Sequence, residues 1–230
     1  MIDMGQGRVL EAFRLEAGEL SRAVAGLSES EWDRPTRCEP WSVRELLGHV
    51  RVVIAWLPQM LGGLAPDKAE VSAAEYYRPD DRFSPQTNAA RIGLARNHAA
   101  EHASGAALAA DFAVTWQQVD QMCRAEPEDR VVRTRHGDAM LLSEFLLTRV
   151  VEVAVHGLDL ADALGRDAWL TPEAGAAVLE LLLGAEQLDA ARELGWDGPT
   201  FLRKVTGRAT LDATETAQVE RLGIRWITLG

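Results

Sequence analysis

The sequence predicts a mainly helical, all-α protein, on three observations. Apolar residues recur three and four positions apart through most of the chain, which is the spacing of one face of an α-helix. Alternation typical of a β-strand is confined to short stretches such as 131–135. The composition is rich in Ala and Leu with only 6% aromatic residues, which favours a helical protein over a β-sandwich.

Capping signals mark the starts and ends of the main helices. Ser42 is placed as an N-cap, with Glu45 three positions later as its capping-box partner. Gly165 is a typical C-cap glycine, and Thr171 before Pro172 marks another start. We expect helices over 3–26, 42–61, 86–124 and 143–164, and a fifth that begins at Thr171.

The remaining segments are predicted as connections and short elements. Residues 28–31 form a capping-box turn, and 65–85 form a loop long enough to cover a site. A turn or short hairpin is expected through 136–138. The tail, 196–230, has short helical stretches and a possible final strand at 224–229.

The charge and the cysteines exclude several classes of protein. A net charge of -11 argues against nucleic-acid binding and against anionic membranes. We see no secretory leader and no run of about 18 apolar residues, so we expect a cytoplasmic protein. Cys38 and Cys123 have no paired spacing, which predicts neither a disulfide framework nor a cysteine zinc site.

The helix over 143–164 carries Glu152 and His156 on one side, among Val and Leu. A buried carboxylate takes up a proton unless a cation or several donors meet it. A divalent metal is one such cation, and spacing of four positions lets both side chains ligate one ion. His49, in the "LLGHV" stretch of the second helix, offers a third ligand.

From the residues alone, other interpretations of this helix stay open. Glu152 and His156 can form a plain helix hydrogen bond. Arg149, one turn before Glu152, can neutralise it as a buried ion pair or contact an anionic substrate. Asp159, one turn beyond His156, can orient that imidazole or lie on the helix surface.

Further polar residues are candidates on weaker grounds. His98 and His102 lie in Ala-rich, polar surroundings, which predicts a solvated face and a structural role. We expect Cys38 to be a small buried cysteine and His136 to belong to its turn. Residues that can line a pocket on position alone are Tyr76, Tyr77, Arg82, Asn88 and Arg208.

Two motifs together resemble a known family. "RPTRCEPWSVRELLGHV" (34–50) and "TRVVEVAVHGLDLADALG" (148–165) are similar to the mycothiol-dependent maleylpyruvate isomerase family, a branch of the DinB-like four-helix bundles. "FLRKVTGR" (201–208) resembles the tail of its shorter members. The resemblance implies a DinB-like metal-binding bundle over 1–165, with 166–230 as a short, largely helical extension packed on it.

The same resemblance implies a cofactor and a cosubstrate. The cofactor is a divalent metal, usually zinc, held by His49, Glu152 and His156. The cosubstrate is mycothiol or a related small thiol. A metal-bound thiol loses its proton and becomes a nucleophile near neutral pH, so the chain need not supply a nucleophile of its own.

One departure from the family bears on the reaction. The better-known isomerases carry a sizeable α/β C-terminal domain, whereas 166–230 here has a largely helical pattern. This favours a thiol-dependent S-transferase or related enzyme, acting on a small electrophile, over maleylpyruvate isomerisation. Hydrolysis by metal-activated water is an alternative on the same site. A non-catalytic helical protein that binds a small molecule or a partner is the alternative from another class.

Overall fold

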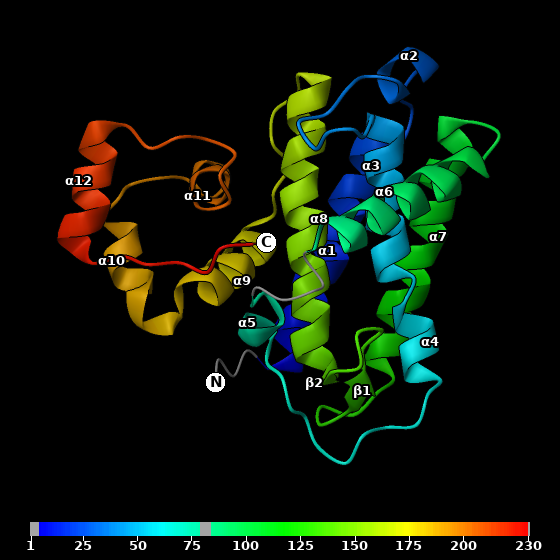
Figure 1. Cartoon of the computed structure of the whole chain (residues 1–230), viewed down its shortest axis with the longest axis horizontal. Helices are drawn as coiled ribbons and strands as arrows, with labels where there is room; N and C mark the ends of the chain where they lie inside the picture. Colours follow the sequence, from blue (N-terminus) through cyan, green and yellow to red (C-terminus); the bar gives the residue numbers. More distant parts are fainter. Residues whose placement is uncertain (1–4, 79–83, 230) are drawn as a thin grey trace.

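A four-helix bundle forms one side of the molecule, on the right in Figure 1, and the C-terminal segment forms the other. The computed structural model describes residues 5–78 and 84–229, and it is mainly helical, as the sequence predicts. Helices α1 and α3 each pack against both α7 and α8, around a cluster of buried apolar side chains. The bundle helices are α1 (Gln6–Val24), α3 (Val43–Ile54), α7 (Gly105–Arg124) and α8 (Leu142–Leu164).

Helix α8 has the most central position. Its side chains are buried on nearly every side, because α1, α3 and α9 all pack against it. It ends at Gly165, whose φ of +65° is the left-handed conformation that favours glycine at a helix C-terminus. Among the described residues, no helix combines the length and the apolar character needed to cross a bilayer.

The second predicted helix is divided in the structure, so the prediction of one helix over 42–61 is wrong. Helix α3 ends at Ile54, and α4 (Leu57–Leu61) follows after a short break. Pro58 explains the break, because proline has no N–H to donate and its ring clashes with the carbonyl four residues earlier. In this chain that carbonyl belongs to Ile54, the last residue of α3.

The third predicted helix, 86–124, is also divided. Helix α6 (Pro85–Ala100) is separated from α7 by a turn in which Ser104 caps α7. A Cβ at Gly105 would lie 2.1 Å from ring atoms of Trp32, so glycine is needed for this close approach. The turn lets α6 run across α3 (Figure 1).

Short elements fill the connections. The capping box at Ser28 is present and begins α2 (Glu29–Trp32). The loop predicted over 65–85 contains α5 (Ala73–Tyr76). The predicted hairpin is confirmed as β1 (Val131–Arg133) paired antiparallel with β2 (Ala139–Leu141).

The C-terminal segment packs on one side of α8. Helix α9 contacts α1 and α8, and α11 contacts α8 and α9. The final strand predicted at 224–229 is wrong: the segment is extended, but Ile227 N–H bonds to Leu182 O of α9 at 2.8 Å instead of to a strand. The elements are α9 (Pro172–Leu183), a 3₁₀ turn (Ala185–Gln187), α10 (Leu188–Arg192), α11 (Gly198–Val205) and α12 (Ala213–Leu222).

Candidate metal centre

Three side chains with metal-binding donor atoms meet between α3 and α8. His49 Nε2 lies 3.2 Å from Glu152 Oε2, and His156 Nε2 lies 3.4 Å from the same oxygen. All three donor atoms lie within 4.8 Å of one another. The structure therefore brings together the three residues that the sequence singled out as candidate ligands.

Local structure explains why these residues meet. Glu152 and His156 are one turn apart on α8, so their side chains project from the same face. His49 lies two turns into α3, whose start is fixed by the Ser42 capping box. Trp41, directly before that cap, stacks on the His49 ring with centroids 4.7 Å apart, which holds the imidazole in place.

The donor set fits a zinc-type ion in kind and in spacing. Two imidazoles and one carboxylate are donors that zinc accepts readily. Ligand atoms arranged tetrahedrally at about 2.0–2.1 Å from an ion lie roughly 3.3 Å apart. The observed separations of 3.2 and 3.4 Å match that value. Three protein ligands also leave a coordination position for a ligand from outside the chain.

The pKa shifts at two of these residues favour their metal-binding forms. Burial opposes the charge of Glu152, but hydrogen bonds from His156 and His49 outweigh it and hold the pKa of the carboxyl well below its usual range. Burial lowers the pKa of His49. Metals bind ionised carboxylates and neutral imidazoles, so both shifts reduce the proton competition for the ion.

Asp159 contacts the opposite side of the His156 ring. Its Oδ2 lies 3.0 Å from His156 Nδ1, so Nδ1–H donates to the carboxylate and Nε2 is left facing Glu152. Burial works against a charged His156, but hydrogen bonds with Asp159, Cys38 and Glu152 raise its pKa well above the usual value. Asp159 is fully buried, so it has the orienting position rather than a place on the helix surface.

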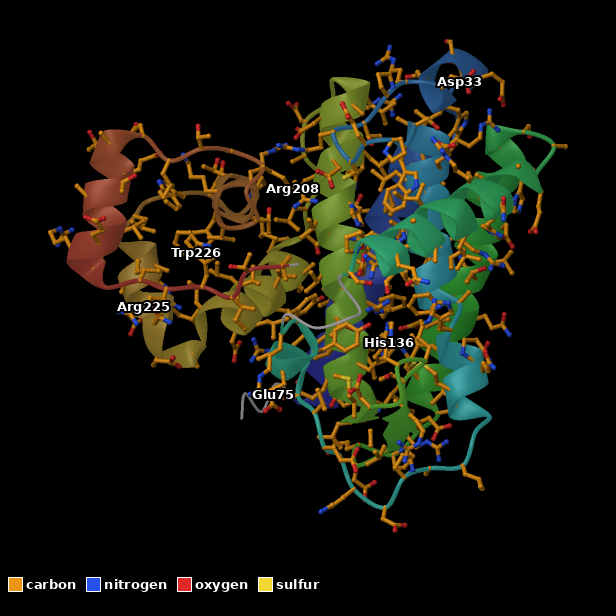
Figure 2. The ribbon with its side chains drawn as sticks, in the orientation of Figure 1. Asp33, Glu75, His136, Arg208, Arg225 and Trp226 are labelled. Atoms are coloured by element: carbon orange, nitrogen blue, oxygen red, sulfur yellow. The ribbon has the colours of Figure 1, made fainter. Side chains whose placement is uncertain are left out.

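Arg208 holds Asp159 from the C-terminal segment. Its Nε and Nη2 donate to Oδ1 and Oδ2 of Asp159, each at 2.7 Å. Figure 2 shows Arg208 between α11 and α8. Burial opposes the Asp159 charge, but the hydrogen bonds from His156 and Arg208 keep the pKa of the carboxyl far below its usual range.

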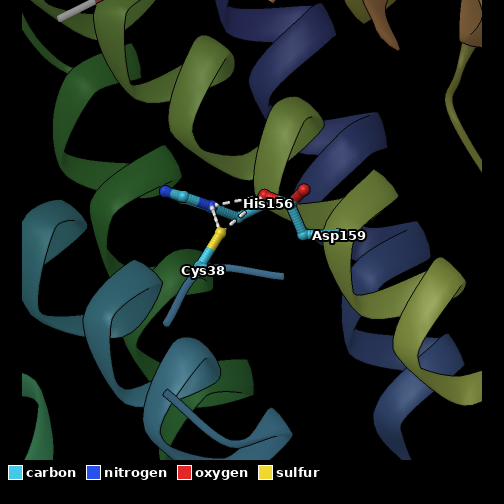
Figure 3. A group of neighbouring side chains, drawn as sticks. All are labelled: Cys38, His156 and Asp159. Atoms are coloured by element: carbon cyan, nitrogen blue, oxygen red, sulfur yellow. Dashed lines mark hydrogen bonds and ion pairs between the residues drawn. The ribbon is translucent and has the colours of Figure 1, made fainter. Parts of the chain in front are cut away.

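Cys38 lies beside His156 and Asp159 (Figure 3). Its Sγ is 3.1 Å from Asp159 Oδ2 and 3.9 Å from His156 Nδ1. These three residues also have donor atoms close enough to hold an ion. Because His156 Nδ1 carries the proton that it donates to Asp159, this nitrogen has no lone pair for an ion, and we assign Cys38 to a hydrogen-bond network around His156. No local pattern predicts this contact, which depends on how the loop before α3 folds.

Arg149 is not a close partner of Glu152. Its Nη2 lies 4.0 Å from Glu152 Oε1, while Nε donates to Thr148 Oγ1 at 3.1 Å and Nη1 donates to Val53 O at 3.3 Å. The guanidinium is buried and lies 4.7 Å from the centre of the Phe145 ring. An ordinary Arg149–Glu152 ion pair therefore does not account for the buried acid.

A cavity of about 210 Å³ opens beside the three candidate ligands. The Glu152 side chain keeps 22% of its surface exposed because it faces this space. Tyr76, Tyr77 and Arg208, predicted from position alone, do line the cavity. The other lining residues include Trp41, Val53, Trp56, Arg91, His136, Arg149 and Leu229.

Three other candidates lie elsewhere. Asn88 is not among the lining residues and instead accepts a hydrogen bond from Arg91 Nη1 at 2.7 Å. Arg82 falls outside the described residues. His98 and His102 lie at the end of α6, and their side chains are only 13% and 16% exposed, so the solvated face expected there is not observed.

The fold and the site place this chain among helical-bundle proteins with a candidate metal centre between two helices. Comparison with known proteins then identifies its family. The chain belongs to the mycothiol maleylpyruvate isomerase N-terminal domain family, whose sequence model matches residues 13–161. Two solved structures of a mycothiol-dependent maleylpyruvate isomerase, one of them a mutant, have the same fold. They are 19% and 20% identical to the chain, each with a TM-score of 0.54.

The alignments cover most of this chain but a smaller share of each protein that it resembles. The solved structures match 82% and 76% of this chain, and 73% and 68% of theirs. Two uncharacterised proteins from two strains of Mycobacterium tuberculosis are each 27% identical over 164 residues, or 69% of this chain. The chain spans 57% of the length of these curated relatives.

Proposed function

We propose that this protein is a metal-dependent enzyme that uses mycothiol, or a related small thiol, as a nucleophile toward a small electrophilic molecule. The observation that carries the proposal is the convergence of His49, Glu152 and His156 within 4.8 Å at the wall of a cavity. Family membership supports the choice of thiol, because the family and the solved structures with this fold are named for mycothiol.

Each part of the chain then has a role at the centre. His49, Glu152 and His156 hold the metal, which when bound lowers the pKa of a thiol ligand and makes it nucleophilic near neutral pH. Asp159 accepts a hydrogen bond from His156 Nδ1 and orients the ring so that Nε2 faces the metal position. Because the pKa of His156 is raised in the metal-free protein, binding of the ion would release the proton from Nε2. Arg208 fixes Asp159, and Trp41 fixes the plane of the His49 ring.

The size of the cavity indicates how the two reactants divide the space. Sites for drug-sized ligands measure roughly 300–1,000 Å³. A cavity of about 210 Å³ therefore takes the sulfur-bearing end of a large thiol together with a small electrophile. The aromatic rings of Trp56, Tyr76 and Tyr77 give the space apolar walls, which exclude water from the reacting atoms.

Arg149 favours an electrophile that carries a carboxylate. Its guanidinium is buried at the cavity wall, and among the described residues its nearest carboxylate oxygen is that of Glu152, 4.0 Å away. A guanidinium has five N–H donors in a fixed fork, and protein oxygens accept from Nε and Nη1. An anionic group on the substrate would compensate the buried charge and fix the orientation of the electrophile.

The fate of the thiol adduct distinguishes the two reactions of this proposal. In a transferase, the thiolate sulfur adds to one carbon of a conjugated double bond, the π bond breaks, its electrons take up a proton from water at the other carbon, and the conjugate leaves with its carbon–sulfur bond intact. In an isomerase, sulfur adds to a conjugated double bond, rotation follows, and the same carbon–sulfur bond breaks to release the thiol unchanged. Both reactions need the same thiolate and the same positioning of the electrophile.

The test combines metal analysis with product analysis. The protein is purified in the presence of zinc, and metal content, mycothiol binding by calorimetry, and products with a panel of electrophiles by mass spectrometry are measured. We expect the His49→Ala variant to lose an ion, thiol binding and products together. Thiol conjugates would identify a transferase, and isomerised product with recovered thiol would identify an isomerase.

The Asp33→Ala variant is a matched control, since Asp33 is an exposed acid outside the cavity. It should match the wild type in metal content, thiol binding and products. Metal bound equally by wild type and His49→Ala would contradict the proposal. Thiol binding that persists after full removal of the metal would contradict it as well.

A further inference from the structure

A second group of donor atoms lies where α6 ends and α7 begins. His98 is in the last turn of α6, His102 follows that helix, and Asp111 is in α7. His98 Nε2 and His102 Nε2 lie 3.3 and 3.5 Å from Asp111 Oδ2. All three donor atoms fall within 4.8 Å of one another, as they do at the first centre.

The spacing matches that of ligands around one ion. Tetrahedral ligands at zinc distances lie roughly 3.3 Å apart. His98 Nε2 has that separation from Asp111, yet it is buried and makes no hydrogen bond within the described part of the chain. A short distance between His98 Nε2 and Asp111 Oδ2 without a hydrogen bond is expected when both atoms direct a lone pair at the same ion position and not at each other.

The other nitrogen of each ring has an acceptor nearby. His102 Nδ1 lies 3.0 Å from the backbone carbonyl of His98, so Nδ1 carries the proton in the neutral ring. His98 Nδ1 lies 3.5 Å from a carboxylate oxygen of Glu101. A backbone carbonyl or a carboxylate on the second nitrogen is the usual arrangement for a metal-ligating histidine, because it leaves Nε2 free to bind.

Arg51 of α3 is the competing cation at this cluster. Its Nε and Nη2 donate to Asp111 Oδ2 and Oδ1 at 2.6 and 3.1 Å. Each carboxylate oxygen has two lone pairs, so Asp111 can keep Arg51 and still offer an oxygen to an ion. Arg51 weakens the site electrostatically without closing it, and its removal should tighten binding.

We propose that His98, His102 and Asp111 form a second zinc-type site, separate from the centre at His49, which joins the end of α6 to α7. An ion bound by His98 of α6, His102 of the turn and Asp111 of α7 would clamp the turn before Gly105 in its folded geometry. The ion bound there contributes to stability by binding the folded state and not the unfolded chain.

The experiment titrates Co²⁺ and Zn²⁺ into the full, metal-stripped chain, with Co²⁺ followed by visible absorption and Zn²⁺ by elemental analysis. The wild type should bind two ions per chain. His49→Ala and Asp111→Ala should each bind one, and the double variant none. Because each single variant reports one site, failure here is distinguishable from failure of the proposed enzyme centre.

Controls keep the result independent of misfolding. Circular dichroism checks each variant, and His102→Gln offers a milder change with the same expected loss of one ion. Asp120→Ala is matched to Asp111→Ala, because Asp120 is also an arginine-paired acid of α7, and it should keep two ions. Arg51→Gln should tighten the second site by about tenfold or more.

Two results would overturn the proposal. The first is a folded Asp111→Ala or His102→Gln variant that binds as many ions as the wild type. The second is a His49→Ala variant that binds none. An unchanged affinity in Arg51→Gln would contradict Asp111 as a ligand of the ion.

Discussion

His156 Nδ1 lies 3.0 Å from Asp159 Oδ2, and Arg208 binds both oxygens of that same carboxylate. These contacts form a continuous chain from the C-terminal segment to a residue at the candidate metal centre. Because Arg208 follows α11 and His156 is in α8, the segment after Gly165 contributes directly to the site. Arg208 was a candidate from its position in the sequence alone, and the structure shows the contact through which it reaches the site.

The Asp159→Asn variant should bind metal more weakly. Asparagine keeps the shape of the side chain but removes the charge that holds the Nδ1 proton of His156. Losses of about 10–100-fold in metal affinity are typical when such a partner is changed. Competition of the protein with a chromophoric chelator measures the affinity.

A neighbouring acid on α8 gives the control for this variant. Asp162 pairs with Arg203 near the surface at 2.6 Å, whereas the polar contacts of His156 within the described residues are with Cys38, Glu152 and Asp159. Asp162→Asn should leave the metal affinity within about twofold of wild type. Equal losses in Asp159→Asn and Asp162→Asn would show that the effect comes from the general charge of the helix.

The Arg149→Met variant tests the charge of the substrate. Methionine fills much of the same volume but has no donors, so an electrophile with a carboxylate should lose about 10–100-fold in kcat/KM. The same electrophile as its neutral ester should react equally well with both proteins. An equal loss for acid and ester would contradict a contact between Arg149 and the substrate carboxylate.

The raised pKa of Glu16 predicts that the free energy of unfolding depends on pH, and this effect does not involve the metal centre. Burial raises the pKa of Glu16 to about 7, although Thr171 N–H and Oγ1–H both donate to its Oε2 at 2.8 and 2.7 Å. The folded protein therefore binds a proton here that the unfolded chain, with a pKa of 4.5, releases. Stability from this group is complete below pH 4.5 and is lost as the pH rises to 7.

The Glu16→Gln variant isolates this effect. Glutamine imitates the protonated acid, so the free energy of unfolding of the variant should exceed that of wild type at pH 8 by up to about 3 kcal/mol. The difference should shrink toward pH 4.5. Urea denaturation at several pH values measures it, and a difference that does not change with pH would contradict the raised pKa.

The close approach of Trp32 to Gly105 predicts that a larger residue at this turn, between α6 and α7, destabilises the protein. A Cβ there meets the Trp32 ring at 2.1 Å, so Gly105→Ala should lower the free energy of unfolding by about 1–3 kcal/mol or more. Gly93 in α6 is the matched control, because a Cβ there meets nothing within 4 Å. Gly93→Ala should raise stability by up to about 1 kcal/mol. Destabilisation by both changes would contradict the packing argument.

Local signals in the sequence predict much of this fold and the candidate ligands. The Ser42 capping box, the Gly165 C-cap and the hairpin around Gly137 are short-range patterns, and each is present in the structure. Glu152 and His156 are one turn apart on a helix, so their meeting follows from helical geometry alone. His49 was predicted as the third ligand from its place beside the apolar stripe of α3 and from the family resemblance.

The features that were missed depend on contacts between distant parts of the chain. The break before α7 is fixed by the approach of Trp32 to Gly105, and nothing near Gly105 in the sequence reveals that ring. Cys38 and Arg208 meet Asp159 only after two separate segments fold onto α8. The extended segment at 224–229 has the composition of a strand but lies against a helix, so it finds no strand to pair with.

Anomalous diffraction at the zinc edge, from crystals of the zinc-loaded protein, locates the ion itself. We expect a peak about 2.0–2.2 Å from His49 Nε2, an oxygen of Glu152 and His156 Nε2. Asp159 should still accept a hydrogen bond from His156 Nδ1 in that crystal. A zinc-loaded crystal with no peak between α3 and α8, and with Glu152 bound by Arg149 instead, would show that these three residues do not hold a metal.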